Sequence, residues 1–174
     1  MKKIMSTLIA AALLTTHITG LRANAATYSR LVDNDPIASG CSFNYGYMTY
    51  YSGISGSYNN DMRLSDLSIR NDANAEWCFP AIYTSVKSCN VTLRVYLNHT
   101  NFTDPGAIYL VKTQSDSSTV IGTIDQKYAI GGWNELSKTI SKSKYIDIYS
   151  VSVGSSYGTY KQLGADAINL EISY

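Results

Sequence analysis

The sequence predicts an all-β chain, folded as an antiparallel β-sandwich or barrel of about eight or nine strands. Apolar and polar residues alternate along much of the chain, helical periodicity is almost absent, and clusters of Gly, Ser and Asn separate the alternating runs. Successive side chains of a strand point to opposite faces, so alternation places one set in a core and the other in solvent. These observations together favour stacked or closed sheets over a helical fold.

The clearest strand covers residues 91–97, where Val91, Leu93 and Val95 share one face. A slip in the alternation between Ile148 and Val151 predicts a β-bulge in another strand. The remaining strands are expected at residues 40–48, 73–79, 107–111, 120–124, 146–153 and 165–172.

Residues 1–25 have the pattern of a secretory signal peptide. Two lysines follow the first Met, an apolar stretch covers residues 4–14, and Ala23-Asn24-Ala25 supplies small residues at the cleavage site. A membrane span needs roughly 20 apolar residues, more than this stretch contains. The sequence therefore predicts cleavage near Ala25 and a secreted, single β-sandwich domain at residues 26–174, with a leader typical of bacteria.

The charge balance changes when this leader is removed. The 174-residue chain has 14 basic and 13 acidic residues, a net charge of +1, and the leader holds three of the basic residues and no acidic one. The mature chain is therefore slightly acidic and keeps one histidine, His99. This composition argues against nucleic-acid binding, a multi-histidine metal centre and intrinsic disorder.

Three cysteines remain in the mature chain: Cys41, Cys78 and Cys89. Because exported proteins meet oxidising conditions, we expect a Cys78–Cys89 disulfide that closes a short loop. Pairing of Cys41 with either of the other two is an alternative, as are three buried thiols that pack as small apolar side chains.

Catalytic patterns are sparse, so the chain is not predicted to be an enzyme. His99 lies in a polar loop, and no nucleophile motif surrounds a Ser. Asp166 stands in a predicted strand between two alanines, where a buried acid needs a partner. We expect Asp166 to be structural and paired with Arg63. The other aspartates that a hydrolase would require have turn-like contexts: Asp33, Asp35, Asp61, Asp66 and Asp125.

Two of these acidic segments also offer oxygen donors of the kind that calcium prefers. They are Asp33-Asn34-Asp35 and Asn59-Asn60-Asp61, and neither follows the EF-hand spacing. Turn formation is the favoured explanation of both segments, so no cofactor is predicted, with structural calcium as the alternative.

The most informative feature is the excess of tyrosine, 15 Tyr against 3 Phe and 2 Trp. A tyrosine offers a flat apolar face and a polar tip, which suits sugar rings and also protein surfaces. Tyr45 and Tyr47 share strand parity with Phe43 and are expected to be packed, and both tryptophans, Trp77 and Trp133, are expected in the core. The predicted ligand-binding residues lie in two loops: Tyr50, Tyr51, Tyr58, Asn60, Tyr157 and Tyr160.

A series of short motifs resembles one known family. In chain order they are residues 32–35 (VDND), 56–63 (GSYNNDMR), 75–77 (AEW), 95–96 (VY), 124–126 (IDQ), 131–136 (GGWNEL) and 165–168 (ADAI). This order resembles the golvesin C-terminal-like domain, which is also described as similar to the carbohydrate-binding domain of xanthan lyases. The resemblance implies a jelly-roll-like β-sandwich of secreted bacterial proteins and a role in carbohydrate binding.

The sequence thus predicts a secreted, non-enzymatic module that binds a polysaccharide, a cell-surface glycan or another extracellular surface through tyrosine-bearing loops. A protein partner, as in an extracellular assembly or competition factor, is the second hypothesis, and a small hydrolase with paired carboxylates is the third. Nucleic-acid binding and a membrane span are not expected.

Overall fold

The computed structural model describes residues 26–35, 41–66, 73–113, 117–129, 131–142, 145–155 and 161–174. They form three sheets in which every pairing is antiparallel. Sheet A has the order β1 (Thr27–Val32), β12 (Ile168–Ser173), β6 (Ser88–Leu97) and β9 (Gly132–Ser141). Sheet B has the order β2 (Ser42–Gly46), β5 (Asn74–Tyr83), β10 (Asp147–Gly154), β7 (Ala107–Thr113) and β8 (Ser117–Ile124).

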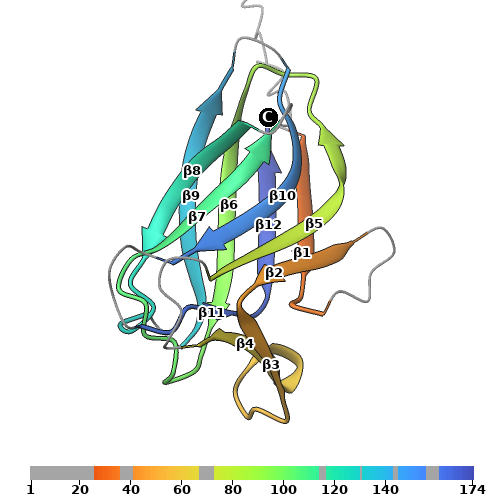
Figure 1. The fold of residues 1–174 in the computed structure, drawn as a ribbon. Coiled ribbons are helices and arrows are strands. Elements are labelled where there is room, and N and C mark those ends of the chain that lie inside the picture. Colours follow the sequence, from red (N-terminus) through yellow and green to blue (C-terminus); the bar gives the residue numbers. More distant parts are fainter. Residues whose placement is uncertain are drawn as a thin grey trace, which may run out of the picture.

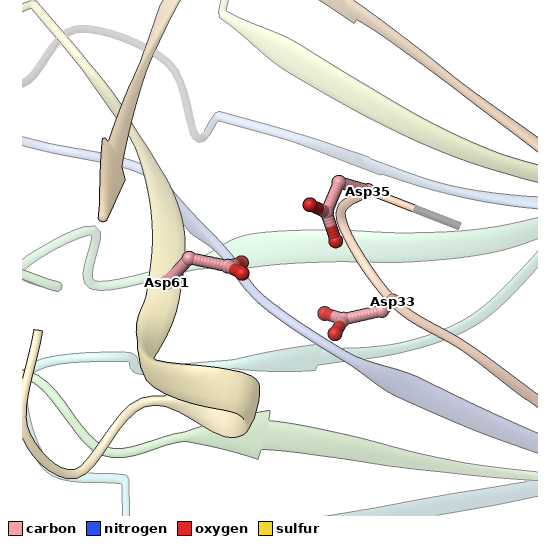
Figure 2. Close-up of side chains that lie close together, drawn as sticks. All are labelled: Asp33, Asp35 and Asp61. Atoms are coloured by element: carbon pink, nitrogen blue, oxygen red, sulfur yellow. The ribbon is translucent and has the colours of Figure 1, made fainter. Parts of the chain in front are cut away.

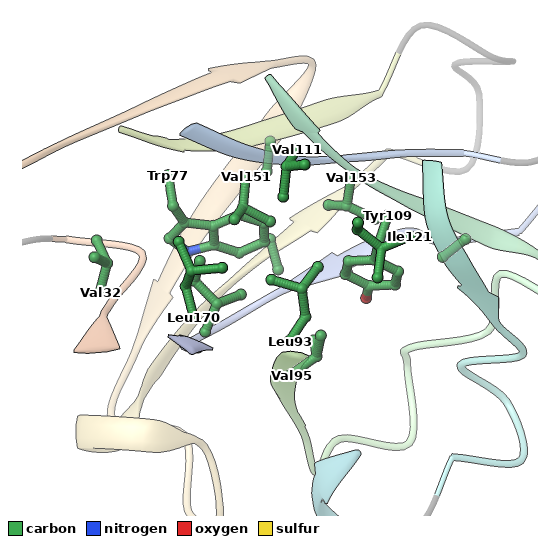
Figure 3. Packing of buried hydrophobic residues seen from close by; sticks show 14 of the residues in the cluster. Val32, Trp77, Leu93, Val95, Tyr109, Val111, Ile121, Val151, Val153 and Leu170 are labelled. Atoms are coloured by element: carbon green, nitrogen blue, oxygen red, sulfur yellow. The ribbon is translucent and has the colours of Figure 1, made fainter. Parts of the chain in front are cut away.

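Sheets A and B pack face to face around one apolar core (Figure 3). Leu93 and Leu170 project from sheet A, and Trp77, Val111 and Val151 project toward them from sheet B. The alternation along β6 determines which of its side chains enter the core. The odd-numbered residues from Cys89 to Leu97 are buried, and the even-numbered residues face outward. The two sheets confirm the predicted all-β antiparallel sandwich.

Sheet C is a small addition at one end of the sandwich, the lower end in Figure 1, opposite the C-terminus. It consists of β11 (Gly164–Ala165), β4 (Asp61–Ser65) and β3 (Met48–Ser52), and the 3-10 turn η1 (Tyr58–Asn60) precedes β4. Within the described ranges, no helix is long and apolar enough to cross a membrane.

The described residues contain twelve strands, more than the eight or nine expected. Three strands, β1, β4 and the ten-residue β9, lie outside the expected ranges, and the segment expected as one strand at residues 165–172 is divided into β11 and β12. The segment expected as one strand at residues 40–48 is divided at Tyr47, which has φ +54° and separates β2 from β3. The predicted bulge is confirmed, because the pairing of β10 with both neighbours shifts between Ile148 and Ser150.

The expected Cys78–Cys89 disulfide is wrong, since all three cysteines are free thiols. Cys78 lies on β5 of sheet B with its side chain on the outer face, where the Asn44 amide donates a hydrogen bond to its sulfur at 3.4 Å. Cys89 lies on β6 of sheet A and points into the core. Proximity in sequence was misleading because the chain changes sheets between them.

A polar contact on the outer face of sheet B gives a pH-dependent prediction. Burial raises the pKa of Glu76. The ammonium of Lys112 at 2.7 Å and the hydroxyl of Ser150 at 2.6 Å lower it by more than burial raises it, so the pKa of Glu76 lies below its ordinary value. An acid with a lowered folded-state pKa stabilises the fold above its unfolded-state pKa, and this contribution is lost as the pH falls.

We therefore expect Glu76→Gln to reduce the free energy of unfolding by about 1–2 kcal/mol at pH 7. The difference from the parent protein should shrink as the pH drops below about 4.3, the ordinary pKa of Glu. Urea unfolding at pH 7, 5 and 3 measures it, and a difference that is the same at all three values would contradict the assignment.

Candidate functional site

Three aromatic rings form a cluster at the end of the sandwich that carries sheet C. Tyr58 belongs to η1, Tyr96 is near the end of β6, and Trp133 is near the start of β9. The ring centroids are 5.7 Å apart for Tyr58 and Tyr96, 5.7 Å for Tyr58 and Trp133, and 5.2 Å for Tyr96 and Trp133. All three contacts are edge-to-face, which is a favourable arrangement for aromatic rings. We call these residues the aromatic cluster.

Sheet pairing creates the cluster. Tyr96 and Trp133 are direct partners in the register of β6 and β9, so both rings lie on the outer face of sheet A. Trp133 remains 41% exposed, and the two tyrosines are partly buried against it. The cluster is therefore a preformed apolar surface that solvent reaches.

The carbonyl of Gly56 holds the surrounding loop against the cluster. It accepts hydrogen bonds from the Tyr96 hydroxyl at 3.1 Å and from the Asn98 side-chain amide at 2.8 Å. Gly56 has φ +92°, and a Cβ there would lie 3.0 Å from the Asn98 nitrogen. A glycine suits this position because both the backbone conformation and the close approach disfavour a side chain.

A cavity of about 200 Å³ opens next to Asn98. Polar groups in its wall include Asn98, His99, Gln126 and Lys127, and Phe102 supplies an apolar side. His99 Nδ1 accepts a hydrogen bond from the backbone N–H of Asn101 at 3.2 Å. This arrangement offers hydrogen-bonding groups beside an aromatic surface, which is the chemistry of a small-molecule recognition site.

A second aromatic surface surrounds Arg63 on β4. The guanidinium carbon lies 3.9 Å from the ring centroid of Tyr45 and 5.2 Å from those of Phe43 and Tyr50. These cation–π contacts occupy Arg63, whose Nε also donates to the Asn34 carbonyl at 3.4 Å. The expected pairing of Arg63 with Asp166 is wrong, because the arginine turns toward the rings instead.

Asp166 is fully buried beneath the loop that carries Tyr58. Its Oδ2 accepts a hydrogen bond from the Tyr58 backbone N–H at 3.0 Å, and its carbonyl accepts one from Trp77 Nε1 at 3.0 Å. Burial raises the pKa of Asp166 to about 8, and the charges of Asp33 and Asp61 raise it as well. The hydrogen bond from the Tyr58 N–H acts in the opposite direction and lowers this pKa. Asp166 therefore connects the core tryptophan to the segment that positions Tyr58.

Asp33, Asp35 and Asp61 converge although the chain brings them from two separate segments (Figure 2). The charges of Asp33 and Asp61 also act on Asp166. Burial raises the pKa of Asp33 to about 6, although the Asn34 backbone N–H and the Asn59 side chain donate hydrogen bonds to it. Burial also raises the pKa of Asp61 above its ordinary value. The two acidic segments that the sequence analysis gave as possible calcium donors, residues 33–35 and 59–61, thus lie close together.

The structure separates the tyrosines that were expected to act together. Tyr58 joins the aromatic cluster, whereas Tyr50 lies beside Arg63. Tyr51, the next residue of β3, lines a different hollow with Asp66 and Gln162. Asn60 is exposed in η1 with φ +63°. The predicted residues Tyr157 and Tyr160 lie outside the described residues.

Two expectations about packing are wrong, and one important residue was not predicted. Trp133 is exposed rather than in the core, unlike Trp77, which is fully buried. Tyr45 and Tyr47 are more than half exposed, since Tyr45 lies on the edge strand β2 and Tyr47 lies in the turn between β2 and β3. Tyr96 was missed, although it alternates with buried Val95 and Leu97 and so had to face outward. The same parity argument, applied to Glu135 and Trp133, would have placed the indole on the surface.

No protein-family model matches the sequence, and no curated protein matches it, so the resemblance to the golvesin C-terminal-like domain stays a prediction. Solved structures do match. CBM29_1, a family 29 carbohydrate-binding module from Piromyces equi, has a TM-score of 0.48 at 10% identity and covers 86% of this chain and 89% of its own. The family 32 module from C. perfringens NanJ, in complex with galactose, has a TM-score of 0.46 at 13% identity over 82% and 99%.

CBM35 from Cellvibrio japonicus Abf62 has a TM-score of 0.50 at 11% identity and covers 82% of this chain and 92% of its own. At this identity the likeness concerns the fold. The chain therefore has the antiparallel β-sandwich fold of that CBM35.

Proposed function

We propose that the chain is a secreted, non-enzymatic carbohydrate-binding module whose ligand surface is the aromatic cluster. The observation that carries the proposal is the exposed indole of Trp133, which Tyr58 and Tyr96 contact edge-to-face at the end of the sandwich that carries sheet C. Aromatic faces bind the C–H side of sugar rings, and neighbouring amides and hydroxyls bind the sugar hydroxyl groups.

The neighbouring groups support this role. The cavity beside the cluster offers the side chains of Asn98 and His99 for hydrogen bonding. The three rings of the cluster carry no charge, so binding should depend weakly on salt. The CBM35 fold likeness and the motif resemblance to the golvesin C-terminal-like domain are consistent with the same class of ligand.

Secretion is part of the proposal and rests on the leader at residues 1–25, which lies outside the described residues. A module exported in this way would meet polysaccharides or glycans outside the cell. N-terminal sequencing of the exported protein should begin at Ala26.

The direct test is affinity electrophoresis of the mature protein in gels that contain xylan, β-glucan, galactan or peptidoglycan fragments. We expect retardation by at least one of them and a loss of affinity of about 30-fold for Trp133→Ala, since removing an aromatic hot spot costs at least about 2 kcal/mol. Tyr83→Ala is the matched control, because Tyr83 is 73% exposed at the far end of β5.

A second variant separates the two aromatic surfaces. Tyr50→Ala alters the surface around Arg63 and should leave the affinity unchanged. Retardation by none of the polysaccharides would overturn the proposed function. Loss of binding in Tyr50→Ala with retention in Trp133→Ala would instead move the ligand site to β3 and contradict the assignment to the aromatic cluster.

A further inference from the structure

The carboxylates of Asp33, Asp35 and Asp61 form a group with the dimensions of a metal site. Each offers an oxygen, and the three oxygens lie within 4.8 Å of one another. Asp33 and Asp35 follow β1, and Asp61 begins β4, so the group joins sheet A to sheet C (Figure 2). Asp33 and Asp61 are buried, whereas Asp35 reaches solvent and leaves the group accessible to an ion.

Buried oxygens around this group lack donors, which is an observation separate from the clustering. Asn34 Oδ1, Asp61 Oδ1 and Asp166 Oδ1 accept no hydrogen bond from any described residue. Asn34 and Asp166 have no exposed surface. Both side chains interact with the three carboxylates. The Asn34 amide lowers the pKa of Asp61, and the charges of Asp33 and Asp61 raise the pKa of Asp166.

Such an arrangement is costly without a cation. A buried carboxylate loses its hydration, and several carboxylates together repel one another. The charge of Arg63 lowers the pKa of Asp61, but the guanidinium lies over Tyr45. No ion pair among the described residues includes Asp33, Asp35, Asp61 or Asp166. A bound divalent ion would supply the missing positive charge and complete the coordination of the orphaned oxygens.

The donor set and its size identify the ion class. The available ligands are all oxygens, whereas zinc prefers sulfur and nitrogen ligands. The donor set therefore suits calcium or magnesium better than zinc. Calcium takes six to eight oxygen ligands in flexible geometry, whereas magnesium requires a near-octahedral arrangement and usually keeps several waters. The three carboxylate oxygens lie within 4.8 Å of one another, which fits calcium, and calcium also accepts the larger and less regular sets of oxygen ligands that Asn34 and Asp166 would complete.

We propose that Asp33, Asp35 and Asp61 bind one calcium ion, with the oxygens of Asn34 and Asp166 as further donors. The ion would fix the end of β1 to the start of β4. Because Asp166 also holds the Tyr58 backbone N–H, calcium would stabilise the loop that presents Tyr58 to the aromatic cluster. This role is independent of which carbohydrate the module binds.

The test is isothermal titration of calcium into the mature protein after treatment with EDTA and removal of the chelator. We expect one site, a weaker response to magnesium, and a rise in Tm of about 5 °C or more when calcium exceeds its Kd a hundredfold. Asp35→Asn should weaken calcium binding by more than about tenfold. It should still fold, because Asp35 is exposed.

Asp147→Asn is the matched control, since Asp147 lies at the far end of β10, opposite Tyr83 in the sheet register. It should bind calcium as the parent protein does. Absence of binding heat together with a Tm that neither calcium nor EDTA changes would overturn the proposal. Equal affinity for magnesium, or equal weakening in Asp35→Asn and Asp147→Asn, would also contradict it.

Discussion

Trp77→Ala should destabilise the protein by about 3–5 kcal/mol, since truncation of a buried aromatic side chain leaves a large cavity. Trp77 has no exposed surface, and its ring packs edge-on to Phe43 at 5.5 Å. Its Nε1 also donates to the Asp166 carbonyl, so the loss reaches the loop that holds Tyr58. Urea unfolding, followed by circular dichroism, measures the free energy of unfolding.

Trp77→Phe keeps this prediction testable if the alanine variant does not fold. Phenylalanine retains most of the apolar contact but removes the N–H donor and leaves the Asp166 carbonyl without this partner. We expect a smaller loss of about 1–3 kcal/mol, the usual cost of an unsatisfied buried acceptor. A free energy of unfolding equal to that of the parent protein in Trp77→Phe would contradict the role of this hydrogen bond.

Gly164→Ala is expected to cost at least about 3 kcal/mol, the upper part of the usual range for overpacking. A Cβ at Gly164 would lie 2.0 Å from Cδ1 of Phe102, whose buried ring has little room to move. The Gln126 side chain also holds both the N–H and the carbonyl of Gly164, so the backbone cannot shift without breaking these bonds. Because Phe102 lines the cavity beside the aromatic cluster, the substitution should distort that cavity as well.

Gly154→Ala is the matched control for this substitution. No atom would lie within 4 Å of its added Cβ, and its backbone is not in the positive-φ region. We expect a change within about 0.5 kcal/mol, as for most surface substitutions. Comparable destabilisation by the two substitutions in thermal unfolding would show that contact with Phe102 is not the cause.

Alternation predicted the sandwich because it is a local consequence of burying one face of each strand. It located β6 and the bulge in β10, where the apolar residues are regularly spaced. It gave little information about β11, which has two residues and exists because it pairs with β4. Short strands of this kind depend on tertiary contacts that no local pattern records.

The candidate site was less predictable because its members meet through long-range pairing. Tyr96 and Trp133 are 37 positions apart in the chain and become neighbours through the register of β6 and β9. Asp33, which follows β1, and Asp61, which begins β4, also converge although the chain separates them. The sequence identified the relevant residue types, tyrosines and aspartates, but the fold decided which of them share a surface.

The aromatic cluster also explains how the fold serves the proposed function. The sandwich supplies a rigid outer face for Tyr96 and Trp133, and the Gly56 carbonyl holds the loop that carries Tyr58 against them. Since the rings are already in contact, little conformational entropy is lost when a sugar binds, and a preorganised surface of this kind favours affinity.

The most direct test of carbohydrate binding at this surface uses the two tryptophans as internal probes. A ¹H–¹⁵N spectrum of the protein should contain two indole N–H signals, from buried Trp77 and from Trp133, and Trp133→Phe assigns them. During titration with an oligosaccharide from a polysaccharide that retards the protein, the Trp133 signal should shift progressively and the Trp77 signal should stay in place. A bound oligosaccharide that leaves the Trp133 signal unchanged would contradict the proposed site.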